Sequence, residues 1–410
     1  MNSTMAQGVS RRSFMRILGA ASAAATSLPA FAATQQAAAT QAPRRGGMRG
    51  MEPLPDGTVI ISANENPLGP AQSALSAIGT TAPLGGRYHG DEYQKTLVVF
   101  NDLFSLKRGY SSLYPGSSGP LDLALMSNIG PDKPLVYGDP SYEQGPRAAD
   151  VMKAQKFPVP LTATYAHDVK AMLKAHPSPG AYYIVNPNNP IGYTISPDQI
   201  KQVLDCCSRL STILIVDEAY FEFCGITSAD LVTRSSHLIV TRSFSKAFGL
   251  AGLRLGYLLA PRQIMDVLGR ANNPKSVTSF AKAGALAALR HVAAVHAYVE
   301  EVVQSRMEYE ELFKRHGIKY FPSSSNFILF QYDDAKALIR SLEDRNIFVR
   351  DRTSQFDGVG HVRVSVGGKE STKVAIQALD EFLSGGGATN SDLGTAAEET
   401  FAGASPARPD

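Results

Sequence analysis

Short apolar runs rich in β-branched residues alternate with helical segments through most of this 410-residue chain. When each strand is followed by a covering helix, successive strands pair side by side and form a mostly parallel sheet. The predicted strands of this series lie at residues 134–137, 182–185, 213–216, 238–241 and 255–259. The sequence therefore predicts an α/β fold, with a large domain whose mostly parallel sheet is sandwiched by helices.

Helix signals support this alternation and lead into a second domain. Ser196 is expected to cap a helix that begins at Pro197, and Gln199 completes a capping box with it. One long helix is expected over residues 280–316. A βαββα-like pattern follows, with strands at 326–330, 347–349 and 362–366 and helices at 335–343 and 369–382. This remainder predicts a smaller α+β domain.

The expected domain boundaries follow from these patterns. Residues 33–50 and 385–410 are rich in small and polar residues without apolar periodicity, which predicts a flexible linker and a disordered tail. The large domain is expected at 81–279. Residues 51–80 are assigned to the smaller domain, and 280–384 are expected to supply a linking helix and the rest of that domain.

The first 32 residues carry the pattern of an export signal. Arg11, Arg12 and Arg16 stand before an uncharged, Ala-rich stretch, and Ala30 and Ala32 supply small side chains where cleavage would occur. Residues 1–32 resemble a twin-arginine signal peptide, which implies the twin-arginine export machinery as a partner and a periplasmic or otherwise exported location. The alternative is an accidental basic leader. The apolar stretch is too short and interrupted to span a bilayer, which takes about 20 apolar residues.

Charge and cysteine content exclude several classes of function. The three arginines of the leader account for the whole net charge of +3, so the chain from residue 33 on is neutral overall. A chain without net positive charge does not attract a polyanion by its overall charge, so no nucleic-acid partner is expected. Cys206, Cys207 and Cys224 form no Cys-x-x-Cys motif and accompany no His-x-His motif. Neither a disulfide framework nor a metal site is therefore expected.

Polar residues that could carry chemistry follow three of the predicted strands. Asp217 directly follows the strand at 213–216, Lys246 follows the next strand, and the Asn-Pro-Asn-Asn-Pro-Ile-Gly turn at 186–192 follows the preceding one. Open α/β sheets bind ligands at the carboxyl ends of their strands. A buried Asp217 would need a cationic partner, and a lysine beside a buried site can form a Schiff base.

Four segments in this order resemble the fold-type I pyridoxal-phosphate-dependent aminotransferases of class I/II, and within them the histidinol-phosphate aminotransferase group. They are SANENP at 62–67, NPNNPIG at 186–192, DEAY at 217–220 and SKAFGLAGLRLGY at 245–257. The resemblance implies pyridoxal 5'-phosphate as cofactor and a ping-pong Schiff-base mechanism. An amino acid, with glutamate as the expected donor, would give its amino group to a 2-oxo acid or a phosphorylated carbonyl acceptor.

The resemblance implies catalytic roles for Lys246, Asp217 and Tyr220 and cofactor contacts for Asn189 and Tyr142. Lys246 would form the Schiff base with the cofactor and carry the proton in transfer, while Asp217 would pair with the pyridinium nitrogen. Tyr220 and Asn189 would hydrogen-bond the phenolic oxygen of the cofactor, and Tyr142 would stack on its ring. Tyr142 could equally be a packed loop aromatic.

The same resemblance implies a cup for the cofactor phosphate. Backbone N–H groups at the turn before a helix beginning near Leu121 can cradle a dianion. The expected residues of the cup are Ser117, Ser118, Ser243, Ser245 and Arg254. Tyr88 resembles the tyrosine that reaches this phosphate from a neighbouring subunit, which implies a homodimer with shared active sites.

Substrate binding is expected from the smaller domain. Arg363 resembles the arginine that holds the substrate carboxylate or its phosphate equivalent, because a planar guanidinium suits either anion. Arg350 occupies the place of a second anion-binding arginine, or alternatively forms a surface ion pair with Asp351. Asn64 is expected to line the entrance.

Departures from the group leave the substrate open. Ser118-Gly119-Pro120 stands where an acidic residue is usual, Ile191 stands where Thr is common, and His89 replaces a proline. Since histidine-biosynthesis metabolites are cytoplasmic, export predicts a different acceptor, in the direction of an aromatic or secondary-metabolite amine. Two alternatives remain: a lyase or decarboxylase resembling threonine-phosphate decarboxylase, and an exported binding protein that has lost catalysis.

Overall fold

The computed structural model describes residues 55–88, 91–103 and 105–385. The described residues from Asp56 onward belong to one compact unit. The expected signal peptide at 1–32, the linker at 33–50, the tail beyond Gly385 and the departure at His89 lie outside the described residues.

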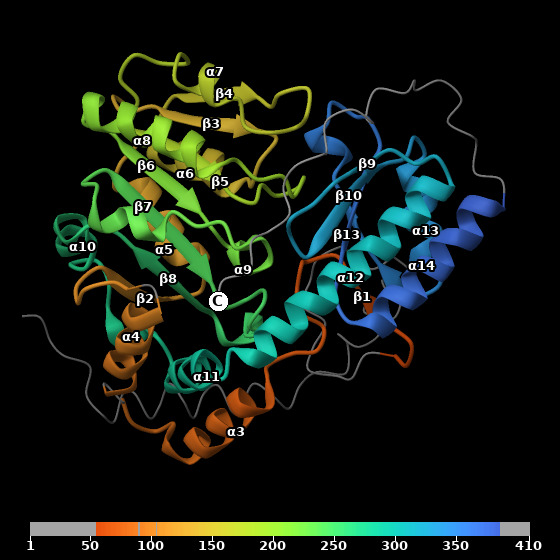
Figure 1. Ribbon diagram of the computed structural model, residues 1–410, viewed down its shortest axis with the longest axis horizontal. Coiled ribbons are helices and arrows are strands. Elements are labelled where there is room, and N and C mark those ends of the chain that lie inside the picture. The colour runs from red at the N-terminus through yellow and green to blue at the C-terminus, as the bar shows by residue number, and fades with distance from the viewer. Residues whose placement is uncertain (1–54, 89–90, 104, 386–410) are drawn as a thin grey trace, which may run out of the picture. The chain divides into compact units, whose positions relative to one another are not determined.

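A seven-stranded mixed sheet forms the centre of the larger region, with the strand order β2-β8-β7-β6-β5-β3-β4 (Figure 1). The five neighbouring strands β7, β6, β5, β3 and β4 run parallel, whereas β8 runs antiparallel to both of its neighbours, β7 and β2. The strands are β2 (Ser111–Pro115), β3 (Leu135–Asp139), β4 (Lys156–Pro160), β5 (Ala181–Val185), β6 (Ile213–Asp217), β7 (Leu238–Ser243) and β8 (Leu255–Leu259). The predicted α/β fold with a mostly parallel sheet is confirmed.

The strand at 255–259 departs from the parallel series. Only the short loop 244–254, with the 3₁₀ turn η4 (Ala251–Leu253), joins β7 to β8. A parallel neighbour needs a crossover of a dozen or more residues, whereas a short loop returns the chain antiparallel. The short loop also holds Lys246 and Arg254 at one edge of the sheet.

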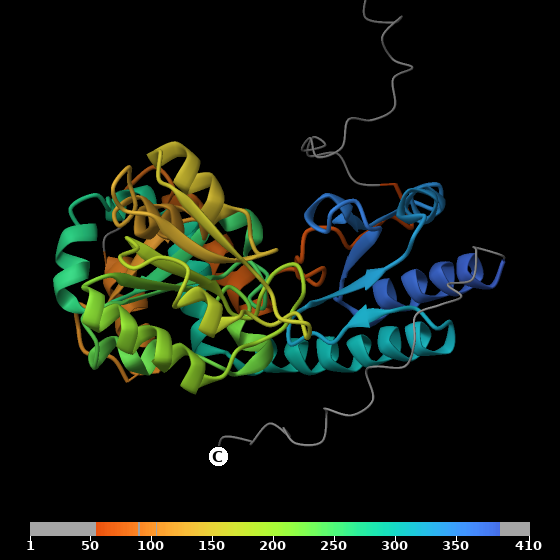
Figure 2. The same cartoon turned by 90° about the horizontal axis from the view of Figure 1, so that it is seen from above.

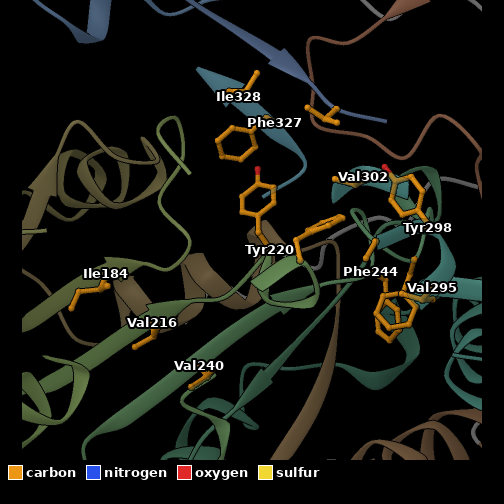
Figure 3. Packing of buried hydrophobic residues seen from close by; sticks show 14 of the residues in the cluster. Ile184, Val216, Tyr220, Val240, Phe244, Val295, Tyr298, Val302, Phe327 and Ile328 are labelled. Atoms are coloured by element: carbon orange, nitrogen blue, oxygen red, sulfur yellow. The ribbon is translucent and has the colours of Figure 1, made fainter. Parts of the chain in front are cut away.

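Successive residues of each central strand enter two different cores. Ile184, Val216 and Val240 lie in register on β5, β6 and β7 (Figure 3). They belong to the same core as Val203 of α8 (Pro197–Leu210). Their neighbours Val185, Ile215 and Ile239 belong to the opposite core, with side chains from α5 (Ser118–Met126) and α6 (Gln144–Met152). Because side chains alternate between the faces of a strand, helices on both faces give these strands their near-continuous apolar sequence.

The capping box predicted for α8 is present. Ser196 Oγ accepts a hydrogen bond from the Gln199 N–H at 3.2 Å, and Gln199 Oε1 accepts one from the Ser196 N–H at 2.9 Å. Both bonds use N–H groups that the first turn of a helix leaves without backbone partners.

The long helical stretch expected over 280–316 is present but is interrupted at His291. Two helices occupy this stretch, α11 (Ser279–Arg290) and α12 (Ala293–Arg315). His291 has a non-helical backbone (φ −126°, ψ 49°), and its Nδ1 lies 2.9 Å from the Ala287 carbonyl oxygen. The break lets α11 stay with the larger region while α12 runs to the smaller one, where it lies along α14 (Lys369–Ser384) (Figures 1 and 2).

The smaller region contains a four-stranded antiparallel sheet with the order β12-β13-β10-β9. Its strands are β9 (Tyr320–Phe321), β10 (Phe327–Gln331), β12 (Arg350–Asp351) and β13 (His361–Ser365). Helices α12, α13 (Ala335–Glu343) and α14 pack with it. The smaller α+β region predicted from the sequence is therefore present.

The expected assignment of 51–80 to the smaller domain is only half right. Strand β1 (Val59–Ile60) does pair in parallel with β11 (Ile347–Phe348) of the smaller region. Helix α3 (Gln72–Thr81), however, packs against α11, and α11 packs against α4 (Asp91–Leu103). The segment thus crosses between the regions, and 61–71 lies between its two halves.

The remaining elements are short. They are η2 (Ala82–Leu84), α7 (Val169–Met172), α9 (Phe221–Cys224), η3 (Ala229–Thr233), α10 (Arg262–Leu268), η5 (Pro274–Ser276) and η6 (Thr353–Gln355). Within the described part of the chain, no helix has the length and apolar character needed to cross a bilayer.

Candidate active site

The polar residues singled out in the sequence gather at the carboxyl ends of β5, β6 and β7. Asp217 is the last residue of β6, and the turn that holds Asn189 follows β5. Ser243 ends β7, and Lys246 lies in the loop that follows. The segment around Asn64 and strand β13 reach this edge through hydrogen bonds described below.

Asp217 is a buried carboxylate whose hydrogen bonds come from neutral donors. Its Oδ1 accepts from the Ala219 N–H at 3.2 Å and from Thr241 Oγ1 at 3.4 Å. Burial raises the pKa of Asp217 to about 7, against the two hydrogen bonds that lower it. The carboxylate is therefore costly to ionise in the chain alone, and a positive charge brought beside it would favour ionisation.

The cation expected beside Asp217 pairs instead with its neighbour Glu218. Arg242 on β7 donates from Nε at 2.9 Å and from Nη2 at 2.8 Å to Glu218 Oε2, and both side chains are 0% exposed. Thr227 and the Ser228 N–H also donate to Glu218, at 2.8 Å and 2.5 Å. Sequence analysis missed this pair, although a glutamate after one strand and an arginine in the next were its visible signal.

We expect Arg242→Met to destabilise the protein strongly. Methionine fills much of the space but leaves the Glu218 carboxylate buried without its cation, which costs about 3–5 kcal/mol in comparable cases. Urea unfolding monitored by circular dichroism measures this loss. Arg345→Met is the matched control, since it breaks a solvent-exposed arginine–glutamate pair with Glu381 and should leave the unfolding midpoint nearly unchanged.

Lys246 is half-buried and points toward the same edge. Its Nζ donates to the Ala63 carbonyl oxygen at 3.0 Å and lies 5.8 Å from the centre of the Tyr220 ring. Burial, and then the positive charge of Arg363, lower the pKa of Lys246 to about 8. About a tenth of this amine is therefore neutral, and hence nucleophilic, at pH 7, and about half at pH 8.

This lowered pKa predicts how cofactor uptake depends on pH. The rate at which apoprotein captures pyridoxal 5'-phosphate should rise as Lys246 loses its proton, with an apparent pKa near 8, and level off above it. Stopped-flow absorbance of the lysine-bound cofactor measures the rate. A midpoint near 10.5, the ordinary value for lysine, would contradict this environment for Lys246.

The Tyr220 hydroxyl is oriented by Asn64, whose Nδ2 donates to it at 2.9 Å. Asn64 is in turn held by Ser365, which accepts from its N–H at 2.8 Å, and by Asn326, which donates to its carbonyl oxygen at 3.1 Å. Figure 3 shows Tyr220 directed toward Phe327, with the two rings 5.2 Å apart at 78°. The Tyr220 oxygen already accepts one bond, so its own proton is available to a further acceptor.

The expectation that Asn64 lines the entrance is wrong. Its side chain is buried, with 1% of the residue exposed, and its backbone has a left-handed φ of 55°. Asparagine tolerates this conformation better than most residues. Asn64 therefore orients the Tyr220 hydroxyl rather than lining the entrance of the site.

Arg363 is the buried cation of the site, with 2% of the residue exposed. Its Nη1 donates to Asn189 Oδ1 at 2.6 Å, and its Nη2 donates to the Ser62 carbonyl oxygen at 2.9 Å. Burial and the nearby arginines lower the pKa of Arg363 to about 9. Arg350 lies directly opposite Arg363 in the β12–β13 ladder but is exposed.

The residues expected to form the phosphate cup include the segment where β2 leads into α5. Gly116 has φ 76°, and a Cβ there would lie 2.7 Å from Arg254 Nη2. Ser117 is the N-cap residue of α5, which begins at Ser118, three residues earlier than expected. Arg254 can therefore lie against residue 116, two positions before α5 begins, only because that residue is glycine.

The hydroxyl groups of the cup have spare hydrogen-bonding capacity. Ser243 Oγ accepts from the Ser245 N–H at 3.0 Å. Ser245 Oγ is buried and has no hydrogen-bond partner among the described residues. A buried hydroxyl, the end of a helix and a guanidinium together suit a dianion such as a phosphate, so the cup fits the phosphate of pyridoxal 5'-phosphate.

Of the two tyrosines expected at the cofactor, Tyr142 lies near the site and Tyr88 lies on the surface. Tyr142 lies on the segment before α6, partly buried, and both burial and the charge of Asp217 raise its pKa. Tyr88 is 82% exposed, and Lys275 Nζ lies 5.6 Å from its ring centre. The structure thus brings Tyr142 to the site within one chain, and leaves Tyr88 on the surface.

Comparison with known proteins identifies the family of the chain. The sequence profile of aminotransferase class I and II matches residues 61–379. The chain belongs to the aminotransferase class I and II family. It is 30% identical over 341 residues to histidinol-phosphate aminotransferase of Halorubrum lacusprofundi, covering 82% of this chain and 91% of that one.

Solved structures agree on the fold of this aminotransferase. Histidinol-phosphate aminotransferase of Clostridium acetobutylicum superposes with a TM-score of 0.74 at 23% identity, covering 80% of this chain and 99% of that one. The enzyme of Sinorhizobium meliloti, solved in complex with pyridoxal-5'-phosphate, superposes with a TM-score of 0.71 at 23% identity and covers 80% and 91%. The expectation of a pyridoxal-phosphate-dependent aminotransferase of fold-type I is confirmed.

Proposed function

We propose that this aminotransferase is of the histidinol-phosphate type and moves an amino group from an amino acid, with glutamate as the leading donor, to a 2-oxo acid or phosphorylated carbonyl. The observation that carries the proposal is the set formed by the half-buried Lys246 and the buried Asp217 and Arg363 at one edge of the sheet. An amine, a carboxylate and an anion-binding guanidinium are the three groups that amino transfer from an amino acid requires.

The proposed cofactor site uses the residues already described. Ser117, Ser118, Ser243, Ser245 and Arg254 would hold the phosphate of pyridoxal 5'-phosphate. Asp217 would face the ring nitrogen, Tyr220 and Asn189 the phenolic oxygen, and Tyr142 the ring plane. The buried unpaired hydroxyl of Ser245 and the glycine-dependent approach of Arg254 support this placement.

The bound cofactor supplies an electron sink that stabilises negative charge at the substrate α-carbon. The residues of the chain supply the rest. Asp217 would favour a protonated ring nitrogen through its negative charge, and Lys246 would move the α-proton as a general base. Asn64 holds the Tyr220 hydroxyl in place at 2.9 Å, and Arg363 binds the substrate carboxylate with its planar fork.

We expect Arg363→Lys to raise KM for amino donors while changing kcat less. Lysine keeps the charge but cannot make the bidentate contact, so kcat/KM should fall about 10–100-fold. Steady-state kinetics with two amino donors measures this split. Arg340→Lys, at an exposed position of α13, is the matched control, and an equal loss in both variants would contradict the role of Arg363.

A donor and acceptor screen on cofactor-loaded protein tests the proposed reaction. Glutamate should convert the cofactor to its amine form, and added oxo acids or imidazole-acetol phosphate should restore it. If the exported enzyme acts outside histidine biosynthesis, an acceptor other than imidazole-acetol phosphate should give the fastest turnover. Release of CO2 without an oxo-acid product would favour a decarboxylase instead.

We also propose a homodimer with shared sites, in which Tyr88 of one subunit reaches the phosphate cup of the other. Its high exposure supports this role, since a surface tyrosine can enter a partner's site. Lys246→Ala and Tyr88→Ala chains should each be weak alone. When the two are co-expressed, the mixed dimer contains one intact site, so activity should exceed that of either variant. No gain would contradict sharing.

We further propose that residues 1–32 direct export by the twin-arginine route to the periplasm. The sequence pattern supports this proposal. A reporter protein fused after residue 32 should be exported from the cytoplasm. The same fusion with both Arg11→Lys and Arg12→Lys should stay in the cytoplasm. Equal export of both fusions would contradict a twin-arginine signal.

A further inference from the structure

Ser365 is a buried serine at the end of strand β13, two residues after Arg363. Residues two apart along a strand point to the same face of a sheet, so Ser365 lies on the face that carries Arg363. The backbone of Ser365 has its own anchor, because its N–H donates to the Ile61 carbonyl oxygen at 2.8 Å. The end of β13 therefore keeps this anchor when the Ser365 hydroxyl is removed.

The Ser365 hydroxyl makes two hydrogen bonds to Asn64. Its Oγ accepts from the Asn64 N–H at 2.8 Å and donates its own proton to Asn64 Oδ1 at 3.1 Å. A serine hydroxyl has a single proton to donate, and here Asn64 Oδ1 receives it. The other end of the same amide, Asn64 Nδ2, donates to the Tyr220 hydroxyl oxygen at 2.9 Å. The bond from Ser365 thus fixes which end of the Asn64 amide faces Tyr220.

These three side chains form a chain of donors that runs in one direction. Ser365 donates to Asn64, Asn64 donates to Tyr220, and the Tyr220 proton is left for the next acceptor. All three residues are buried. Where the local dielectric constant is low, consecutive hydrogen bonds polarise one another, so each donor is strengthened by the one before it. The Tyr220 hydroxyl is therefore a stronger donor with Ser365 present than without it.

We propose that Ser365 is a positioning residue that strengthens, through Asn64, the hydrogen bond from Tyr220 to the phenolic oxygen of the bound cofactor. The inference rests on the proposed function, which places that oxygen at Tyr220. Negative charge on the oxygen attracts the proton of the nitrogen that joins the cofactor to Lys246. A stronger donor at Tyr220 withdraws part of this charge, so the nitrogen loses its proton at a lower pH.

The test is a pH titration of the visible band of the lysine-bound cofactor in the full-length, loaded protein. Tyr220→Phe removes the last donor and should raise the titration midpoint by about one pH unit or more. Ser365→Ala removes the first donor and should raise it by about 0.3 pH unit or more. Ser365→Cys places a weak donor of similar size at this position and should raise the midpoint in the same direction.

Two further variants show whether the hydroxyl group itself is responsible. Ser365→Thr retains a hydroxyl and should titrate at the wild-type midpoint. Ser305→Ala is the matched control, because it removes another buried serine hydroxyl, on α12, and should also leave the midpoint unchanged. Equal rises in Ser365→Ala and Ser305→Ala would overturn the inference, since loss of any buried hydroxyl would then have the same effect.

A double variant tests the route through Tyr220. If Ser365 acts through the Tyr220 hydroxyl, the combination of Ser365→Ala with Tyr220→Phe should titrate at the same midpoint as Tyr220→Phe alone. A further rise in the double variant would overturn the inference, because Ser365 would then reach the cofactor by another route. An unchanged midpoint in both Ser365→Ala and Ser365→Cys would overturn it as well.

The same titrations separate this inference from the proposed function. If Tyr220→Phe raises the midpoint and the Ser365 variants do not, the inference alone fails. If Tyr220→Phe also leaves the midpoint unchanged, the proposed placement of Tyr220 at the phenolic oxygen fails together with the inference. Amino transfer itself still stands in either case if glutamate converts the cofactor of the wild-type protein to its amine form.

Discussion

Lys246→Ala should abolish amino transfer and the visible absorption band of the lysine-bound cofactor. The variant loses both the covalent anchor and the proton carrier, and a positioned general base alone contributes about 10²–10⁴-fold. We therefore expect kcat/KM to fall by about 10⁴-fold or more. Absorbance spectra of the loaded variant and single-turnover kinetics with glutamate measure both effects.

Two further variants make this result specific. Lys246→Arg keeps a charge but cannot act as the nucleophile, so it should be as inactive as Lys246→Ala. Lys275→Ala removes the lysine that lies 5.6 Å from the Tyr88 ring and should retain the visible band. Persistence of the band in Lys246→Ala would mean that another lysine holds the cofactor.

Asp217→Asn should lower activity strongly while stabilising the apoprotein at pH 8. Removing the negative charge from a buried pair typically costs about 3–5 kcal/mol. Because Asp217 is expected to hold the charge of the ring nitrogen, kcat/KM should fall by about 10²–10³-fold. Steady-state kinetics on the loaded variant measures this loss, and full activity would contradict the role of Asp217.

The stability effect has the opposite sign because burial raises the pKa of Asp217 from 3.8 to about 7. The folded apoprotein binds this proton more tightly than the unfolded chain does. Stability from the protonated carboxyl group is therefore complete below about pH 4 and lost as pH rises through 7, on the order of 4 kcal/mol. Asparagine avoids this loss, so thermal melts should show a gain in the variant at pH 8 that disappears near pH 4.

Sequence patterns predicted the parts of the site that depend on local order. Asp217 ends a strand and Lys246 follows the next one, so their placement at one sheet edge follows from parallel topology alone. The capping box at Ser196 and Gln199 is likewise local and is present. Recognition of the family added the roles, and these roles remain predictions for the variants above to test.

Long-range contacts explain what the sequence could not show. Asn64 and Ser365 are 301 positions apart, so no window of sequence indicates that Asn64 is buried beneath Tyr220. The antiparallel β8 was hidden because strand direction depends on loop length rather than on strand composition.

The central claim is that the chain performs the first half of amino transfer at Lys246. Its most direct test is to add glutamate to cofactor-loaded wild-type protein without any acceptor and follow absorbance and products together. The visible band of the lysine-bound cofactor should disappear as one equivalent of 2-oxoglutarate forms per active site. An unchanged spectrum with all twenty amino acids, or release of CO2 without an oxo acid, would contradict it.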